Sequence, residues 1–217
     1  MPFKTSIAAW LLALFAATAC AAEFKTFDYS LFGDISQKIA AANAKFDRLL
    51  VSAKVGVPDN SIAPKDLVFT FASAAGLMTM RPAVDGTLIF PTDPALKAQN
   101  PKVTVNVPKD TKLALTLELQ IRLSDPRSFP YGEVDAALKQ ANALTVEQAG
   151  ALAWFAPEAK GARIRCGVDC TASVADGRKP VRADKNGDVV IPAEAKLRGA
   201  NPSITLSHPA TAAWPML

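Results

Sequence analysis

Residues 86–101 read GTLIFPTDPALKAQNP, and residues 187–202 read GDVVIPAEAKLRGANP. The two stretches share their Gly, first Pro, Leu and final Asn-Pro at the same spacing. Around them, residues 70–108 align on residues 171–209 without a gap, at a constant offset of 101. A shorter match lies upstream, where Phe27-Asp28-Tyr29 resembles Phe129-Pro130-Tyr131. Self-similarity of this kind predicts a fold made of two copies of one unit.

The repeated residues favour turns rather than catalysis. Asp85-Gly86 and Asn186-Gly187 are dipeptides typical of tight hairpins, because such turns need a positive φ. A proline five residues later is predicted to end the next strand, and Asn-Pro to close a short helical segment with an inward-facing leucine. The unit is therefore predicted as hairpin, short helical crossover and strand. The positions that carry this pattern are Gly86, Pro91, Asn100, Pro101 and their counterparts Gly187, Pro192, Asn201, Pro202.

The N-terminus has the features of an export signal, predicted over residues 1–22. Lys4 precedes the apolar stretch 7–17, and small residues follow it, so cleavage is expected after Ala21 or Ala22. The protein is then periplasmic or secreted. One alternative is a membrane-tethered lipoprotein lipidated on Cys20, although the residues before that cysteine match a lipobox only weakly. An uncleaved N-terminal anchor is the third alternative.

The rest of the chain narrows the class of partner. No later stretch is long and apolar enough for a transmembrane segment, so only a lipid anchor would tether the mature chain. The net charge is only +4, with no run of basic residues, and this argues against nucleic acid as a partner. An unknown protein or small ligand is the expected partner.

Hydrophobic spacing predicts the main elements of both repeats. In repeat 1, residues 23–123, a helix is expected over 34–46, starting at a capping box of Asp34 and Gln37, and strands follow it. In repeat 2, residues 124–217, helices are expected over 132–154, with a second helix start at Thr145 and Gln148, again before strands. Repeat 2 ends where the last strand of repeat 1 would begin, so the copies are expected to be incomplete equivalents.

The clearest predicted strand covers residues 112–123. Its odd-numbered residues from 113 to 123 are all Leu or Ile, and its even-numbered residues are polar or small. Strict alternation predicts a strand with one apolar face, and we expect that face in the core. The fold class is therefore α+β, mostly β, with two tandem repeats of helix plus antiparallel sheet in a sandwich-like arrangement.

Residues 176–192, which contain Asp176-Gly177, Asn186-Gly187 and Pro192, resemble one hairpin of the carboxypeptidase-regulatory-like, transthyretin-type β-sandwich modules. The resemblance covers fewer than 20 residues. It implies a sandwich-like fold and a structural or adhesion role, because modules of that family are mostly small exported units. It implies no functional residues for this chain.

Cys166 and Cys170 are the most reactive candidates in the mature chain. In an exported protein they are expected to form a disulfide. The alternatives are a thiol-disulfide redox pair, in which Arg163 or Arg165 would lower a thiol pKa, and a metal site. In the repeat alignment Cys170 falls on Phe69 and Cys166 on Lys65, so a bridge could replace an aromatic packing contact.

Other constellations are too sparse for chemistry. His208 is the only histidine, which leaves no ligand set for zinc and no Ser-His-Asp triad. Asp184, Asn186 and Asp188 have the first spacing of a calcium loop, but the glycine and the twelfth residue do not fit. No catalytic residue, cofactor site or metal site is therefore predicted.

These observations favour an exported non-enzymatic binding or structural protein of the cell envelope or secreted space. The ligand is not indicated by any motif. The alternative function is a periplasmic thiol-disulfide protein that uses Cys166 and Cys170. A third hypothesis is ligand binding in a cleft between the two repeats, where pockets commonly form.

Overall fold

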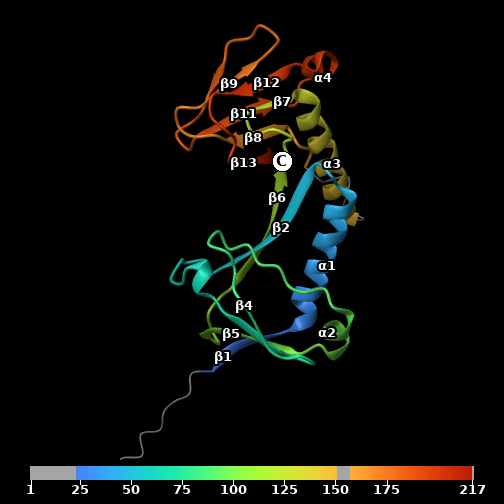
Figure 1. Ribbon diagram of the computed structural model, residues 1–217, viewed down its shortest axis with the longest axis vertical. Coiled ribbons are helices and arrows are strands. Elements are labelled where there is room, and N and C mark those ends of the chain that lie inside the picture. The colour runs from blue at the N-terminus through green and yellow to red at the C-terminus, as the bar shows by residue number, and fades with distance from the viewer. Residues whose placement is uncertain (1–22, 151–156, 217) are drawn as a thin grey trace, which may run out of the picture.

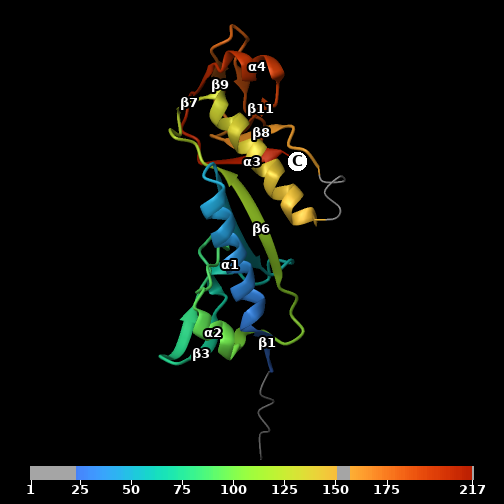
Figure 2. The same cartoon turned by 90° about the vertical axis from the view of Figure 1, so that its right-hand side faces the viewer.

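The computed structural model describes residues 23–150 and 157–216. The molecule is elongated, with the first repeat at one end and the second at the other (Figure 1). The fold is α+β with antiparallel sheets in both halves, as predicted. Helix α1 and the ribbon of strands β2 and β6 run along the long axis between the two ends (Figure 2).

The first half contains two helices, a 3₁₀ turn and six strands. In chain order they are β1 (Phe24–Asp28), α1 (Tyr29–Lys45), β2 (Leu49–Gly56), η1 (Pro64–Asp66), β3 (Phe69–Ser73), β4 (Gly76–Met80), α2 (Pro94–Gln99), β5 (Lys102–Pro108) and β6 (Ala114–Ile121). One sheet has the order β1-β5-β3-β4, and β2 pairs with β6 in a separate ribbon.

The second half repeats this topology. Its elements are β7 (Ser128–Pro130), α3 (Tyr131–Ala149), β8 (Gly161–Arg165), β9 (Thr171–Val174), β10 (Val181–Arg182), β11 (Asp188–Pro192), α4 (Ala195–Ala200), β12 (Ser203–Leu206) and β13 (Ala212–Met216). The order β7-β12-β9-β10 reproduces β1-β5-β3-β4, strand for strand. A second sheet has the order β11-β8-β13.

The expectation that repeat 2 lacks the last strand was wrong. Strand β13 pairs with β8 in the way that β6 pairs with β2: Trp214 faces Arg163, as Glu118 faces Ser52. The gapless alignment misses β13 because the second repeat is shorter before this strand: Thr104 and Thr116 are 12 positions apart, whereas their counterparts Thr205 and Ala212 are seven apart.

The two counterpart strands also meet each other. Strands β6 and β13 are in contact, and the indole Nε1 of Trp214 donates to Glu118 Oε1 at 3.0 Å. Since Trp214 and Glu118 occupy equivalent positions in the two repeats, the halves join through the same part of their fold.

Each half has its own hydrophobic core. The first is built only from first-half residues and contains the aromatic side chains Tyr29, Phe32, Phe69, Phe71 and Phe90. The second contains the inward residues of β8, β9, β11 and α3, and it extends into the first half through Ala42, Phe46, Leu49, Val51 and Ile121. The inner ends of α1, β2 and β6 therefore anchor the first half on the second.

The repeated Asn-Pro joins three elements in each half. Asn100 and Asn201 have positive φ values of 42° and 43° and end the short helices α2 and α4. Their Oδ1 atoms accept from the first turn of the long helices, from Ser30 N at 2.8 Å and Gly132 N at 2.7 Å. The following prolines accept from Tyr29 N at 3.0 Å and Tyr131 N at 2.9 Å through their carbonyls. Asn-Pro is thus the N-terminal cap of the long helix of its own half.

The two helix starts predicted from capping boxes were wrong, because Asn100 and Asn201 cap the long helices instead. Helix α1 begins at Tyr29 rather than residue 34, and Asp34 lies within the helix and pairs with Lys97 at 2.7 Å. Helix α3 runs unbroken from Tyr131 to Ala149, and Thr145 Oγ1 donates to the Ala141 carbonyl at 2.8 Å inside it. The part of the predicted helical region at 151–156 lies outside the described residues.

The Gly86 and Gly187 turns exist, but they are not hairpins. Both glycines have positive φ, 86° and 79°, as their dipeptides predict. Strands β10 and β11, which flank the Gly187 turn, belong to different sheets, so the turn carries the chain from one sheet to the other. The hairpin inferred from residues 176–192 is therefore corrected. The prolines that follow, Pro91 and Pro192, accept the hydroxyl of Tyr29 and of Tyr131 through their carbonyls.

The short helices agree with the prediction, because Leu96 and Leu197 are both buried. Within residues 23–150 and 157–216, no helix is long and apolar enough to cross a bilayer. The predicted signal peptide and the alternative lipidation site Cys20 lie outside the described residues.

The cap formed by Asn201 gives a direct test of the fold. Replacing Asn201 with Ala removes the hydrogen bond to Gly132 N, and alanine tolerates the left-handed conformation less well than asparagine, whose short polar side chain stabilises it. We expect a loss of about 2 kcal/mol in the free energy of unfolding. Asn201→Gly should lose less, since only the cap bond is missing, and Asn201→Asp least. Urea denaturation of the three variants checks this order, and equal losses for Ala and Asp would contradict the capping role.

Candidate ligand-binding groove

The leucine strand β6 forms the floor of the candidate site. It pairs with β2 over eight residues, from Leu49–Ile121 to Gly56–Ala114, and the odd-numbered residues of both strands share one face. Helix α1 covers the β2 side of that face, where Val51, Ala53 and Val55 are buried. The β6 side is left open: Leu115 is 36% exposed and Leu117 is 59% exposed. The prediction that this apolar face lies in the core was wrong for Leu115 and Leu117, whereas Ile121 is buried and Leu113, Leu119 and Leu123 are half-buried against the two cores.

A groove of about 370 Å³ lies over these leucines, between the two repeats. Ile35 and Ile39 of α1 form one wall, and Leu144 of α3 forms the other. Leu117 and Leu119 form the floor. Lys38, Glu118 and Gln148 are the long polar side chains among its lining residues. A concave, mostly apolar surface with a few polar groups is typical of sites for small ligands.

The opposite face of the ribbon is polar. Lys54 pairs with Glu118 at 2.8 Å, and Glu118 also accepts from Trp214. The guanidinium carbons of Arg163 and Arg165 lie 5.3 and 5.0 Å from the Trp214 ring. Together these five side chains line a second cavity of about 430 Å³ between the repeats. Arg163 and Arg165 both pair with Asp188, at 3.7 and 2.8 Å, so every charged group of this cluster has a partner of opposite charge. The arrangement therefore ties the two sheets together.

Glu118 has an altered pKa in this cluster. Burial raises the pKa of its carboxyl group, but the hydrogen bonds from Lys54, Trp214 and Gln120 outweigh this effect and hold the pKa below its usual value of 4.5. The ionised carboxylate is thus part of the contact between the repeats.

Cys166 and Cys170 form a disulfide, with their α-carbons 5.7 Å apart. Both residues are buried in the second core, at 5% and 1% exposure. The residue of repeat 1 that corresponds to Cys166 is Val55 rather than Lys65, because Cys166 N and Val55 N donate to the carbonyls of the equivalent Gly187 and Gly86. Cys170 corresponds to Leu67 rather than Phe69, because the equivalent residues Val105 and Leu206 pair with Phe69 and with Ala172, which lies two residues after Cys170. The bridge therefore stands where Val55 and Leu67 belong to the core of the first half, and it does not replace an aromatic contact.

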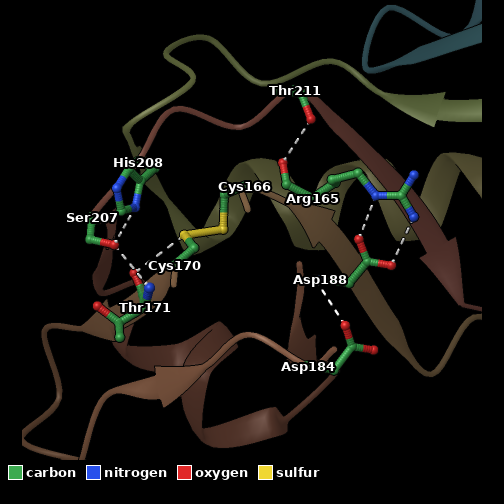
Figure 3. Close-up of a disulfide and its surroundings, with 9 residues drawn as sticks. All are labelled: Arg165, Cys166, Cys170, Thr171, Asp184, Asp188, Ser207, His208 and Thr211. Carbon is green, nitrogen blue, oxygen red and sulfur yellow. Dashed lines mark hydrogen bonds and ion pairs between the residues drawn. A yellow bond between two sulfur atoms is a disulfide. The ribbon is translucent and has the colours of Figure 1, made fainter. Parts of the chain in front are cut away.

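Arg163 and Arg165 do not act on the cysteines. Arg165 extends away from the disulfide and binds Asp188 with both Nε, at 2.8 Å, and an Nη atom, at 3.2 Å (Figure 3). The disulfide instead lies near Thr171, Ser207 and His208, and His208 Nδ1 is 3.0 Å from Ser207 Oγ. The bridge is therefore packed within the second core, and the guanidinium of Arg165 is held by Asp188 instead.

The calcium-like spacing at Asp184 forms a closed turn. Asp184 Oδ1 accepts from Asn186 N at 2.8 Å and from Asp188 N at 3.1 Å, and these backbone donors lower the pKa of Asp184. Because Asp188 is held by Arg165, neither carboxylate faces a shared centre. Among the residues that the structure describes, no three His, Cys, Asp or Glu side chains gather in a way that could hold a metal ion.

Sequence reasoning identified β6 and its leucines but not the groove. Alternation shows that a strand has an apolar face, and it does not show how far a neighbouring helix covers that face. The signal available was the excess of large leucines in β6 over its counterpart β13, Ala-Ala-Trp-Pro-Met, once the two strands are known to be equivalent.

Comparison with known families adds one finding. A family model described as "Protein of unknown function (DUF2987)" matches residues 78–166, which is less than half of the chain. The matched segment includes β6, α3 and β8, and so it contains Leu117, Leu119 and Leu144 of the groove. No curated protein and no solved structure matches the chain.

The contact between Glu118 and its partners predicts a pH dependence of stability. Since the pKa of Glu118 is lower in the folded protein than its ordinary 4.5, its stabilising effect is complete above that value and is lost as the pH falls through the folded pKa. Glu118→Gln should therefore reduce the free energy of unfolding near pH 7 and have a smaller effect at about pH 3. Urea denaturation of both proteins at the two pH values measures this. A difference that grows on acidification would contradict it.

The buried disulfide predicts a structural response to its removal. Replacing Cys166 and Cys170 with Ser should lower the free energy of unfolding by about 2 kcal/mol, through the loss of a short closed loop. The bridge of the native protein should have a reduction potential below about −300 mV, as structural disulfides do. Equilibration with dithiothreitol buffers gives the potential. A value near those of thiol oxidoreductases would instead favour a redox role.

Proposed function

We propose that this chain is an exported, non-enzymatic binding protein that holds an apolar ligand in the groove between its two repeats. The observation that carries the proposal is the exposed leucine floor of β6, with Leu117 open to the groove. Apolar surface of this kind, walled by two helices, is costly to leave in water and marks binding sites.

A comparison of the two repeats supports this location. At positions equivalent to Leu117 and Leu119, strand β13 has the small residue Ala213 and Pro215. Ala213 is 3% exposed, whereas Leu117 is 59% exposed. The same backbone therefore has a packed surface in one half and an open apolar surface in the other, and the packed surface needs no ligand.

The proposal includes where the protein acts. Residues 1–22 are removed as a signal peptide, and the working unit consists of repeats 23–123 and 124–217 in the periplasm or secreted space. The disulfide supports this, because such bonds persist in oxidising compartments. Lipidation of Cys20 would tether the same unit to a membrane. The resemblance of residues 176–192 to transthyretin-type modules agrees with a binding or adhesion role, although the turn there joins two sheets.

A thiol-disulfide function is the second proposal, and burial of both sulfur-bearing residues weighs against it. Exchange requires a thiolate to reach one of the sulfur atoms. With Cys170 at 1% exposure, the folded protein offers little access for this reaction.

Binding of the apolar fluorophore N-phenyl-1-naphthylamine tests the groove. We expect saturable binding to the native protein, and Leu117→Glu should weaken it by about tenfold or more, because a carboxylate would be placed on the apolar floor. Leu77→Glu is the matched control, since Leu77 is also exposed and lies far away on β4. Equal weakening by both substitutions would contradict the proposal, and so would unchanged binding in both variants.

A further inference from the structure

The two repeats differ at one edge of strand β2. In the second half, β11 pairs with β8 over five residues, from Asp188–Arg165 to Pro192–Gly161. In the first half the equivalent pairing stops after one bridge, Lys54–Thr87. Only two hydrogen bonds remain there, Val55 N to the Gly86 carbonyl at 2.9 Å and Leu88 N to the Ala53 carbonyl at 3.0 Å. Beyond Leu88 the chain leaves β2.

Side chains of α1 occupy the hydrogen bonds that the absent strand would make. Asn43 binds both backbone groups of Val51: its Oδ1 accepts from Val51 N at 2.7 Å, and its Nδ2 donates to the Val51 carbonyl at 2.9 Å. Ser36 Oγ accepts from Phe90 N at 3.3 Å. If the ladder continued as in the second half, Val51 and Phe90 would bind each other. The edge of β2 therefore has no neighbouring strand beyond Leu88. At Val51 the side chain of Asn43 makes the backbone hydrogen bonds that a strand would make.

The open edge is fixed by packing. Phe90 stacks on Phe32 of α1, with ring centroids 4.4 Å apart, and also contacts Phe69 and Phe71. The equivalent residue of the second half is Ile191, which stays in the ladder. Closing the first-half ladder with residues 89–91 would pull Phe90 out of this aromatic cluster. The chain's own segment is thus held away from β2.

A cavity of about 650 Å³ occupies the space between β2 and residues 88–92. Its lining includes Leu50, Val51, Ser52 and Ile89, and both Leu50 and Ile89 are exposed large apolar residues. An open strand edge beside exposed apolar side chains is the geometry that receives an added β-strand.

We propose that this edge binds an extended segment of another polypeptide, which pairs with Leu49–Ser52 of β2 in the place that residues 190–193 take beside β8. The second half identifies the occupant, because the equivalent space there is filled by an extended antiparallel segment whose inward residues, Ile191 and Ala193, are apolar and packed against the core. The partner segment has the same character: a strand with alternate apolar side chains. Its backbone replaces Asn43 at Val51. This site lies at the β2 edge of the ribbon, separate from the leucine groove of β6, and does not depend on it.

The natural probe is a synthetic peptide with the sequence of residues 189–194, VVIPAE, because residues 190–193 of this sequence fill the equivalent space in the second half. Fluorescence anisotropy of the labelled peptide measures its binding to the full mature chain. Backbone amide shifts of Val51 and Ser52 by NMR locate the bound peptide. We expect saturable binding with shifts at β2.

Matched peptides test whether backbone pairing is responsible. N-methylation at the position of Ile191 removes an N–H that faces the neighbouring strand in the ladder, whereas N-methylation at Val190 alters an N–H that faces the other way. The first should weaken binding at least about tenfold, and the second should have a much smaller effect.

Matched protein variants test the site. Ile89→Lys should weaken peptide binding at least about tenfold, and Leu77→Lys should leave it unchanged, since both side chains are 76% exposed but only Ile89 borders the cavity. Leu117→Glu should also leave it unchanged, which separates this proposal from the ligand groove. Absence of binding, equal effects of the two N-methyl groups, or shifts confined to β6 would each overturn the proposal.

Discussion

The fold depends on a cap that each long helix receives from the far end of its own repeat. Asn100 and Asn201 bind the first turn of α1 and α3, about 70 residues earlier in the chain in each case. The same residue ends a short helix in the left-handed conformation, and the proline after it begins the next strand and accepts the tyrosine N–H. One dipeptide therefore fixes where two helices and one strand meet, and this explains why Asn-Pro is among the residues that both repeats retain.

This cap also sets the limit of what local sequence can predict. Asp34 with Gln37 and Thr145 with Gln148 have the spacing of capping boxes, but neither pair lies at a helix start. The true first-turn acceptors are distant in sequence and follow a helix rather than precede one. The repeat alignment identified Asn100 and Asn201 correctly. Interpreting them as local turn formers explained the end of the short helix but not the cap on the long helix.

The strands show a similar division. Alternation located β6 because the period of two is a property of the backbone, and the repeated Asn-Pro located the strands that follow it, β5 and β12. Alternation could not place the β6 leucines, because their exposure depends on where α1 ends its cover over the neighbouring β2. Likewise, Asp-Gly and Asn-Gly predicted the positive φ of Gly86 and Gly187, but the sheets that flank each turn are set by long-range pairing. The sequence therefore predicted the leucines of the candidate site, but it did not predict how they are arranged.

The two repeats use the same framework differently. The second half closes its ladder, shortens the loop after β8 and bridges it with a disulfide. The first half keeps a longer connection through η1, an aromatic cluster and an open strand edge. A half with a complete ladder and a half with exposed apolar surface are joined by α1 and the β2–β6 ribbon, so the proposed binding surfaces lie on a frame that does not rely on them for its own packing.

The contact between Glu118 and Trp214 has a consequence for the history of this chain. Two identical subunits that met through this strand would place the same residue on both sides of the contact, and a carboxylate facing itself would repel. Glu and Trp can face each other only if the two copies are free to differ, which requires both to be encoded in one polypeptide. In this chain the two equivalent positions differ, and the contact is a hydrogen bond between an indole and a carboxylate instead of a pair of like charges.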